Sequence, residues 1–136
     1  MASFLLDLVT PERLLFSEQV QAVRAPGVEG SFGVLSGHAP MLTELQIGLI
    51  KVTLPDHSEA FIATAGGFMQ VTRQRVIILA DSAELSEEID VERARRAADR
   101  ARRHLEVKEG DVHAEEARLA LERARNRIRV AELAVK

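Results

Sequence analysis

The chain has 136 residues, a formal net charge of −3, and no cysteine, tryptophan or tyrosine. This length suits one domain or a small domain with an appendage, and the missing cysteines exclude disulfides and thiolate metal sites. The acidic balance and the scarcity of aromatic residues argue against a free-standing nucleic-acid-binding module, which stays open only as a remote alternative. No stretch approaches the roughly 20 apolar residues that span a bilayer, and no export signal is recognisable, so we expect a soluble protein.

The composition changes sharply near residue 84. Residues 1–84 hold all four prolines, seven of the eight glycines and all five phenylalanines, whereas residues 85–136 hold thirteen of the eighteen lysines and arginines. Two parts with such different compositions are expected to form different kinds of secondary structure. We therefore predict a β domain over 1–84 and an α-helical domain over 85–136.

The first part reads as short strands separated by turn residues. Apolar and β-branched runs recur every eight to twelve positions with no helical period between them, which indicates antiparallel strands in a small sandwich or flattened barrel. Turn sequences such as AlaProGlyValGluGly and SerGlyHisAlaPro punctuate the runs. The expected strands are 3–9, 13–16, 19–25, 33–35, 47–54, 60–65, 68–71 and 75–80.

The second part reads as two helices in an antiparallel hairpin. Asp90 or Ser86 is expected to cap the first helix, and the helices are expected to meet near Gly110, with Asp111 capping the second. Small apolar residues recur at 4-3-4 spacing in both helices, so the seam between them is mostly alanine. Such a seam buries little apolar area, and the hairpin is expected to be only marginally stable alone.

Four arginines lie on one side of this seam, each with an acid three residues earlier. We call them the paired flank, and we expect them to form a solvated face whose charges cancel in weak ion pairs. Its members are Arg95, Arg102, Arg118 and Arg125, with Glu92, Asp99, Glu115 and Glu122.

The other side of the seam, here the open flank, carries Arg93, Arg100, Arg123 and Arg127. Only Asp90 and Glu116 oppose them there, and small alanines leave room among them. Four underpaired guanidinium groups repel one another, and a phosphate-bearing small molecule would relieve that cost. The alternative is that Asp90, Glu116 and solvent suffice. Glu84 and Asp90 could also accept hydrogen bonds from a base or ribose beside apolar Ile89, although a capping role for Asp90 is the stronger expectation.

The sequence offers no support for catalysis. It lacks the phosphate-binding loop of nucleotide hydrolases. The four histidines are scattered without ligand spacing, so no metal site is expected. Ser36 and His38 fall in a Gly/Pro turn and are interpreted as turn residues. We expect a non-enzymatic protein that requires no cofactor.

Three segments resemble one known family. Residues 27–43 (GVEGSFGVLSGHAPMLT), residues 65–81 and residues 126–132 are similar to the signature turn, the end of the β domain and the last helix of the epsilon subunit of F-type ATP synthase. The resemblance runs the length of the chain. It implies a β-sandwich of about ten strands followed by a two-helix hairpin, an α+β protein with segregated parts.

The resemblance also implies a function and partners. Members of the family belong to the central stalk, where the sandwich packs on the gamma subunit and its base meets the ring of c subunits. They help to couple rotation to ion flow. The hairpin folds against the sandwich or extends toward the alpha and beta subunits, where it inhibits ATP hydrolysis. The implied location is peripheral, on the cytoplasmic face of the bacterial inner membrane within the F1 sector.

Some bacterial members bind ATP as a regulatory ligand through a motif written I/L-D-x-x-R-A. Here Ile89, Asp90, Arg93 and Ala94 match it. The family's other nucleotide-contacting positions fall on Glu84, Arg100, Arg123 and Arg127, all of matching type. The resemblance therefore implies ATP binding by the open flank, with a subunit that couples without sensing nucleotide as the alternative.

The signature turn departs from the family at one position. Members often carry an acidic or amide residue where this chain has Ser31. The residues that the resemblance implies at the c ring are Ser31, Phe32 and His38.

Overall fold

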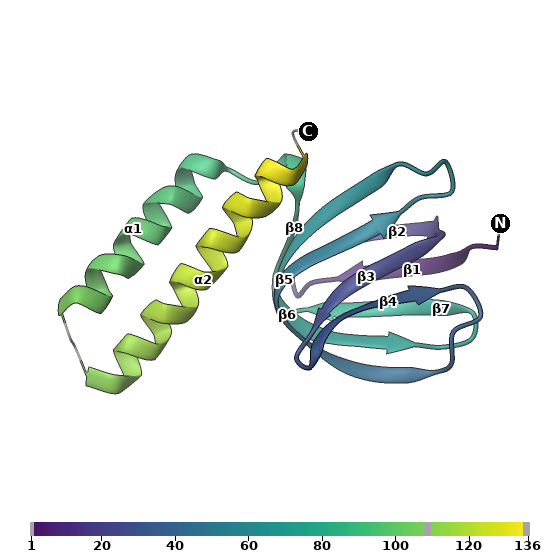
Figure 1. Cartoon of the computed structure of the whole chain (residues 1–136), viewed down its shortest axis with the longest axis horizontal. Helices are drawn as coiled ribbons and strands as arrows, with labels where there is room; N and C mark the ends of the chain where they lie inside the picture. Colours follow the sequence, from purple (N-terminus) through teal and green to yellow (C-terminus); the bar gives the residue numbers. More distant parts are fainter. Residues whose placement is uncertain (1, 108–109, 135–136) are drawn as a thin grey trace.

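The computed structural model describes residues 2–107 and 110–134, which form a β-sandwich with a helical hairpin projecting from one end (Figure 1). The β part contains eight strands: β1 (Phe4–Val9), β2 (Leu14–Val20), β3 (Ala22–Gly27), β4 (Gly30–Leu35), β5 (Met41–Thr53), β6 (Glu59–Val71), β7 (Arg75–Ala80) and β8 (Ala83–Leu85). A short 3₁₀ turn, η1 (Ser86–Glu88), leads to α1 (Val91–Val107) and α2 (Gly110–Ala134). The predicted fold class is confirmed.

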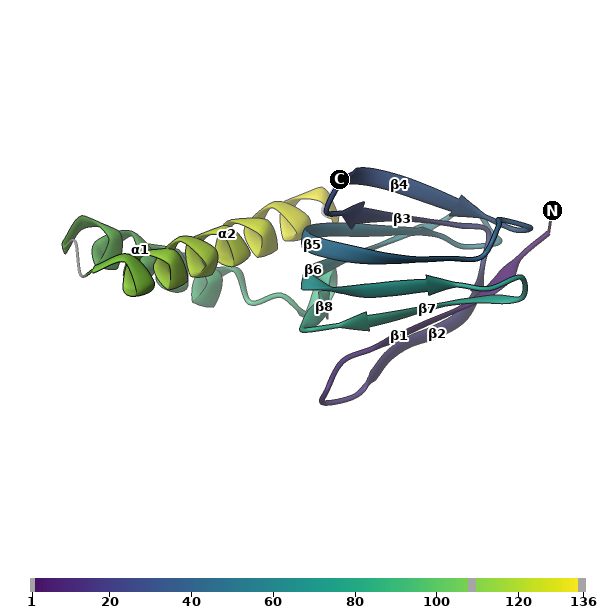
Figure 2. The same cartoon turned by 90° about the horizontal axis from the view of Figure 1, so that it is seen from below.

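The strands follow the order β2-β1-β7-β6-β5-β3-β4, with β8 paired to β6, in a sheet that folds over itself without closing. Strands β5 and β6 are 13 residues each, the longest strands of the described residues. The first half of β6 pairs with β8, and its second half pairs with β7. Figure 2 shows the two layers edge-on, with the hairpin beyond one end.

The core lies between the layers because alternate side chains of each strand point inward. In β1 the pattern is strict, and Leu6 and Leu8 are fully buried while their neighbours are partly exposed. Ile50 and Ile78 bring the same alternation from β5 and β7, whereas in β6 both Ile62, in this core, and Ala63, beneath α2, are buried. These aliphatic residues hold the layers together by the burial of apolar surface.

The strand count is lower than the ten that the resemblance implied. The predicted strands 60–65 and 68–71 are one strand, β6, and the predicted strand 47–54 begins earlier, at Met41. The predicted strand 19–25 is instead divided between β2 and β3. The pairing of β1 with β7 is parallel, whereas the other pairs are antiparallel, and β8 was not predicted.

The strands merge because two consecutive glycines bend β6 without ending it. Gly66 and Gly67 have φ of 108° and 141°, a region that other residues rarely adopt. A Cβ added to Gly67 would overlap the backbone of Leu79 and Ala80 in β7. The AlaGlyGly sequence is therefore the bend at which β6 changes its pairing partner from β8 to β7.

The hairpin begins where the sequence predicts. The backbone N–H of Arg93 donates to Asp90 Oδ1 at 3.0 Å, which makes Asp90 the N-cap of α1. Ser86 starts η1 instead. The predicted break between the helices falls largely on residues 108–109, outside the described residues, and Gly110 opens α2 where we had expected it to end the first helix.

The alanine seam is also confirmed. Ala98, Ala101 and Ala124 are at most 4% exposed and pack with Leu121. Helix α2 lies between α1 and the sandwich (Figure 1). Its later turns pack on β5 and β6 in a small cluster formed by Ala63, Ile89, Val130 and Ala131 with partly buried Leu49, Phe61 and Val91. We call this arrangement the docked hairpin.

Candidate functional site

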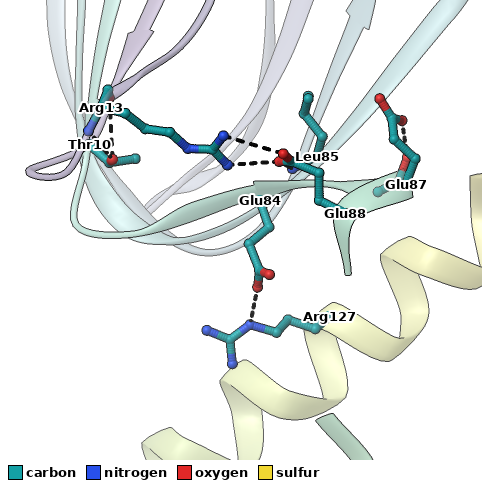
Figure 3. Close-up of polar contacts among 8 residues, drawn as sticks. Thr10, Arg13, Glu84, Leu85, Glu87, Glu88 and Arg127 are labelled. Atoms are coloured by element: carbon teal, nitrogen blue, oxygen red, sulfur yellow. Dashed lines mark hydrogen bonds and ion pairs between the residues drawn. The ribbon is translucent and has the colours of Figure 1, made fainter. Parts of the chain in front are cut away.

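Glu84 and Arg127 meet at the junction between the sandwich and α2. Arg127 Nε donates to Glu84 Oε1 at 2.7 Å, and both side chains are about one-third exposed. Figure 3 shows this pair joining β8 to α2. The sequence analysis placed both residues in one site and expected Glu84 to accept a hydrogen bond from a base or ribose. In the structure Glu84 accepts its hydrogen bond from Arg127 instead.

A small cavity lies beside this ion pair. Its volume is about 10 Å³, enough for roughly one water. Half-buried Arg123 borders it, one helical turn before Arg127, and Asn126 lies between them in sequence. A nucleotide does not fit inside this cavity, so its phosphates would have to lie on the exposed side of the two arginines.

The remaining predicted nucleotide-binding residues lie on or just before α1. Arg93 and Arg100 are exposed, and neither forms an ion pair within residues 2–107 and 110–134. Ala94 is buried in the seam, and Asp90 is engaged in capping. Ile89 is 9% exposed and packs against Val130 and Ala131.

Three of the four predicted ion pairs of the paired flank are present. Arg95 contacts Glu92 at 2.9 Å, Arg102 contacts Asp99 at 3.1 Å, and Arg118 contacts Glu115 at 2.5 Å.

The fourth pair of that flank was predicted wrongly. Glu122 turns back to Arg118 at 3.6 Å, one helical turn earlier, and not to Arg125. Arg125 lies with Gln46 and Arg129 along an open groove of about 530 Å³ between α2 and β5. A carboxylate flanked by arginines at i−4 and i+3 can reach either, and spacing alone does not decide which.

A second ion pair holds η1, the segment that leads into the hairpin, against the sandwich. Arg13 donates to both oxygens of Glu88 at 2.8 and 3.3 Å, and the Leu85 N–H donates to Glu88 Oε1 at 3.4 Å (Figure 3). The hydrogen bond from Arg13 holds the pKa of the Glu88 carboxyl below its ordinary value. Sequence reasoning missed this pair because its members are 75 residues apart.

The N-cap of α1 offers a direct test of local stability. We expect Asp90→Ala to lower the free energy of unfolding of the hairpin by about 1 kcal/mol, because it removes the acceptor of the Arg93 N–H. Asp90→Asn, which keeps a side-chain oxygen, should restore most of the loss. Urea unfolding followed by helical circular dichroism measures both, and equal destabilisation by the two variants would contradict the capping role.

The residues expected at the c ring are separated by strand β4. Ser31 and Phe32 lie at its start, beside an open groove of about 480 Å³ that also touches residues 41–44 of β5. His38 lies past the other end of β4 and borders a different cavity, near the turn between β6 and β7. The three residues therefore do not form one cluster.

The structure thus defines a class of protein: an open β-sandwich whose last strand leads, through an ion-paired connection, into an arginine-rich hairpin. Family models for the ATP synthase delta/epsilon chain match both parts, the β-sandwich domain over residues 3–86 and the long α-helix domain over residues 87–132. The chain belongs to the ATP synthase delta/epsilon family.

Individual relatives agree with this assignment. The chain is 51% identical over 100 residues to the ATP synthase epsilon chain of Carboxydothermus hydrogenoformans, covering 74% of each chain. It is 48% identical over 105 residues to that of Moorella thermoacetica, covering 77% of this chain and 78% of the relative. A chain in the mitochondrial ATP synthase of Euglena gracilis superimposes with a TM-score of 0.83 at 27% identity, over 100% of this chain and 83% of that one.

No helix among the described residues is both long and apolar enough to cross a membrane.

Proposed function

We propose that the protein is the epsilon subunit of the central stalk of an ATP synthase, coupling rotation to ion translocation. Support comes from the epsilon chains to which it is similar and from the Euglena structure, which contains OSCP, F1 and the c-ring in one rotational state. In this role the subunit catalyses nothing itself. It sits at the cytoplasmic face of the bacterial inner membrane, held there by the complex.

The sandwich offers a surface for the gamma subunit. Phe68, Leu79, Val9 and Leu14 are directly opposed across β6, β7, β1 and β2, so their side chains share one face. Phe68, Leu79 and Leu14 are 51%, 56% and 58% exposed. A contiguous exposed apolar row of this kind indicates a protein contact. The groove beside Ser31 and Phe32 is the corresponding candidate for the c ring.

The hairpin supplies the regulatory part of the proposal. Extended helices inhibit ATP hydrolysis through the alpha and beta subunits, and bound ATP favours the docked hairpin. The observation that carries this is the placement of Arg123 and Arg127 beside Glu84, where α2 meets the sandwich. A ligand that contacts both these arginines and the adjoining edge of the sandwich would bind only while α2 is docked.

The energy available to such a switch follows from linkage. A ligand at a hundredfold excess over its dissociation constant stabilises the state that binds it by about 2.7 kcal/mol. The seam between the helices is mostly alanine, and the contact between α2 and the sandwich is small. A stabilisation of this size is therefore enough to shift the equilibrium between the docked and the extended hairpin. Loss of ATP would then release the hairpin.

One observation favours the alternative, a coupling subunit that does not sense nucleotide. The Glu84–Arg127 pair already compensates one charge of the open flank without a ligand. In that case rotor position and not ATP controls the hairpin.

Calorimetric titration of the isolated protein with ATP separates the two functions. We expect saturable binding that is lost when Arg93→Ala is combined with Arg127→Ala. The matched control is Arg95→Ala with Arg102→Ala, which removes the same charge from the paired flank and should leave binding unchanged. Absence of binding at millimolar ATP would favour the alternative.

A further inference from the structure

Asn126 is a buried polar side chain at the contact between α2 and the sandwich. It is 5% exposed, beside the apolar contacts of Val130 and Ala131 and one residue before the partly exposed Arg127–Glu84 pair. Burying an amide is costly unless its donors and acceptors find partners. The partners of Asn126 therefore show what its burial achieves.

The amide joins α2 to two strands at once. Its Nδ2 donates to the Gly48 carbonyl oxygen at 2.7 Å and, more weakly, to the Thr64 carbonyl oxygen at 3.5 Å. Gly48 and Thr64 are directly opposed in β5 and β6. The Oδ1 of Asn126 accepts from Arg129 Nη2 at 2.9 Å. The donor and the acceptor are thus both satisfied, and the donor finds its partners on the sandwich only while the hairpin is docked.

These hydrogen bonds determine where α2 sits along the sheet. The apolar contacts of Val130 and Ala131 are small and have no preferred direction, so they tolerate sliding or rotation of the helix. A hydrogen bond at 2.7 Å tolerates neither. Two directional contacts hold α2 on the sandwich: the partly exposed Arg127–Glu84 pair, which reaches β8, and the buried Asn126 amide, which reaches β5 and β6.

The register of α2 decides where the arginines point. Arg123 precedes Asn126 by three residues and Arg127 follows it by one, and all three border the small cavity beside Glu84. Because a helix is rigid over one turn, holding Asn126 on Gly48 holds the backbone positions of both arginines at the junction.

We propose that Asn126 is the positioning residue of the docked hairpin, placing Arg123 and Arg127 for an anionic ligand. The part that concerns the ligand rests on the nucleotide-sensing function proposed above. The part that concerns docking does not. Released into water, the amide and both carbonyls are solvated again, so Asn126 makes the docked position specific while leaving the hairpin free to open.

The test uses the absence of native cysteine. A single Ala131→Cys thiol lies in the contact between α2 and the sandwich, where alanine is 8% exposed, so its alkylation rate reports how often the hairpin opens. Asn126→Asp keeps the shape and the acceptor for Arg129 but loses the donor. We expect it to raise the alkylation rate about tenfold, the usual size for a lost buried donor.

Asn126→Ala distinguishes positioning from helix stability. Alanine is the better helix former, so a purely helical role predicts slower alkylation. Positioning predicts faster alkylation, by about tenfold, since two buried carbonyls lose their donor. Arg125→Ala, an exposed change one residue away, is the control and should have no effect. An Ala25→Cys thiol in the fully buried sandwich core should stay protected in every variant.

ATP provides the second arm of the experiment. In the parent protein, ATP should slow alkylation at position 131, and the Asn126 variants should need about tenfold more ATP for the same protection. If ATP protects no variant while Asn126→Ala still exposes the thiol, the nucleotide function is wrong and the docking role stands. Unchanged alkylation in both Asn126 variants would overturn the positioning role, whatever ATP does.

Discussion

Gly67→Ala is expected to lower the free energy of unfolding of the sandwich by about 3–5 kcal/mol, among the largest effects of a single added methyl group in this chain. Two costs add. The residue has φ of 141°, a conformation that alanine rarely adopts. Its new Cβ would overlap the carbonyl oxygen of Leu79 and lie 2.8 Å from the Ala80 Cα, and both belong to the backbone of a paired strand that cannot move aside cheaply.

Gly30→Ala is the matched control for that variant. Gly30 has a similar φ of 130°, but a Cβ added there meets nothing within 4 Å. It should therefore carry only the backbone strain, about 1–3 kcal/mol. Urea unfolding of both variants measures the difference. If Gly67→Ala costs no more than Gly30→Ala, the close approach of β6 and β7 at the bend is not what requires glycine.

Ala98→Asp is expected to separate the two helices while the sandwich stays folded. Ala98 is 2% exposed in the seam, next to Ala101, Leu121 and Ala124, which offer no hydrogen-bond donor. A carboxylate there must be neutralised or exposed, at a cost of about 3 kcal/mol or more. Since the seam holds few large side chains, that cost should exceed what the hairpin can lose. Helical circular dichroism should fall, with little change in the melting temperature of the β part.

The control for the seam variant is Ala97→Asp. It makes the same substitution on the same helix one residue earlier, so the change in helix propensity is matched. Ala97 is only half-buried, at the edge of the seam, and a carboxylate there can reach water. It should keep most of the helical signal. Equal losses in the two variants would mean that helix propensity, and not burial in the seam, holds the hairpin together.

The local features of the fold were largely predictable from the sequence. Alternation of apolar residues located β1 and β7, and the 4-3-4 spacing located the buried alanines of both helices. Asp90 was recognisable as an N-cap because its side-chain oxygen accepts a hydrogen bond from a backbone N–H only three residues away. Each of these signals depends on neighbours within one or two turns of chain, which the sequence displays directly.

The candidate site was predictable only in part. The pattern of arginines and acids separated the two flanks, and the structure brings Glu84, Arg123 and Arg127 to one junction. The choice of Glu122 between Arg118 and Arg125 was not predictable, because both lie within reach of one carboxylate. Nor was the pairing of Arg127 with Glu84, which depends on how α2 meets the sandwich.

The sequence by itself thus determined two compositionally distinct parts, the strand and helix periods, the alanine seam and the supply of arginines. Only the tertiary structure decided that β6 passes through a glycine bend, that Arg13 holds Glu88, and that Asn126 meets the carbonyls of Gly48 and Thr64. The physical reason for this division is the distance along the chain over which each interaction acts. Periodicity and capping are local, whereas these contacts join residues up to 78 positions apart, and their partners are set by how the two parts pack.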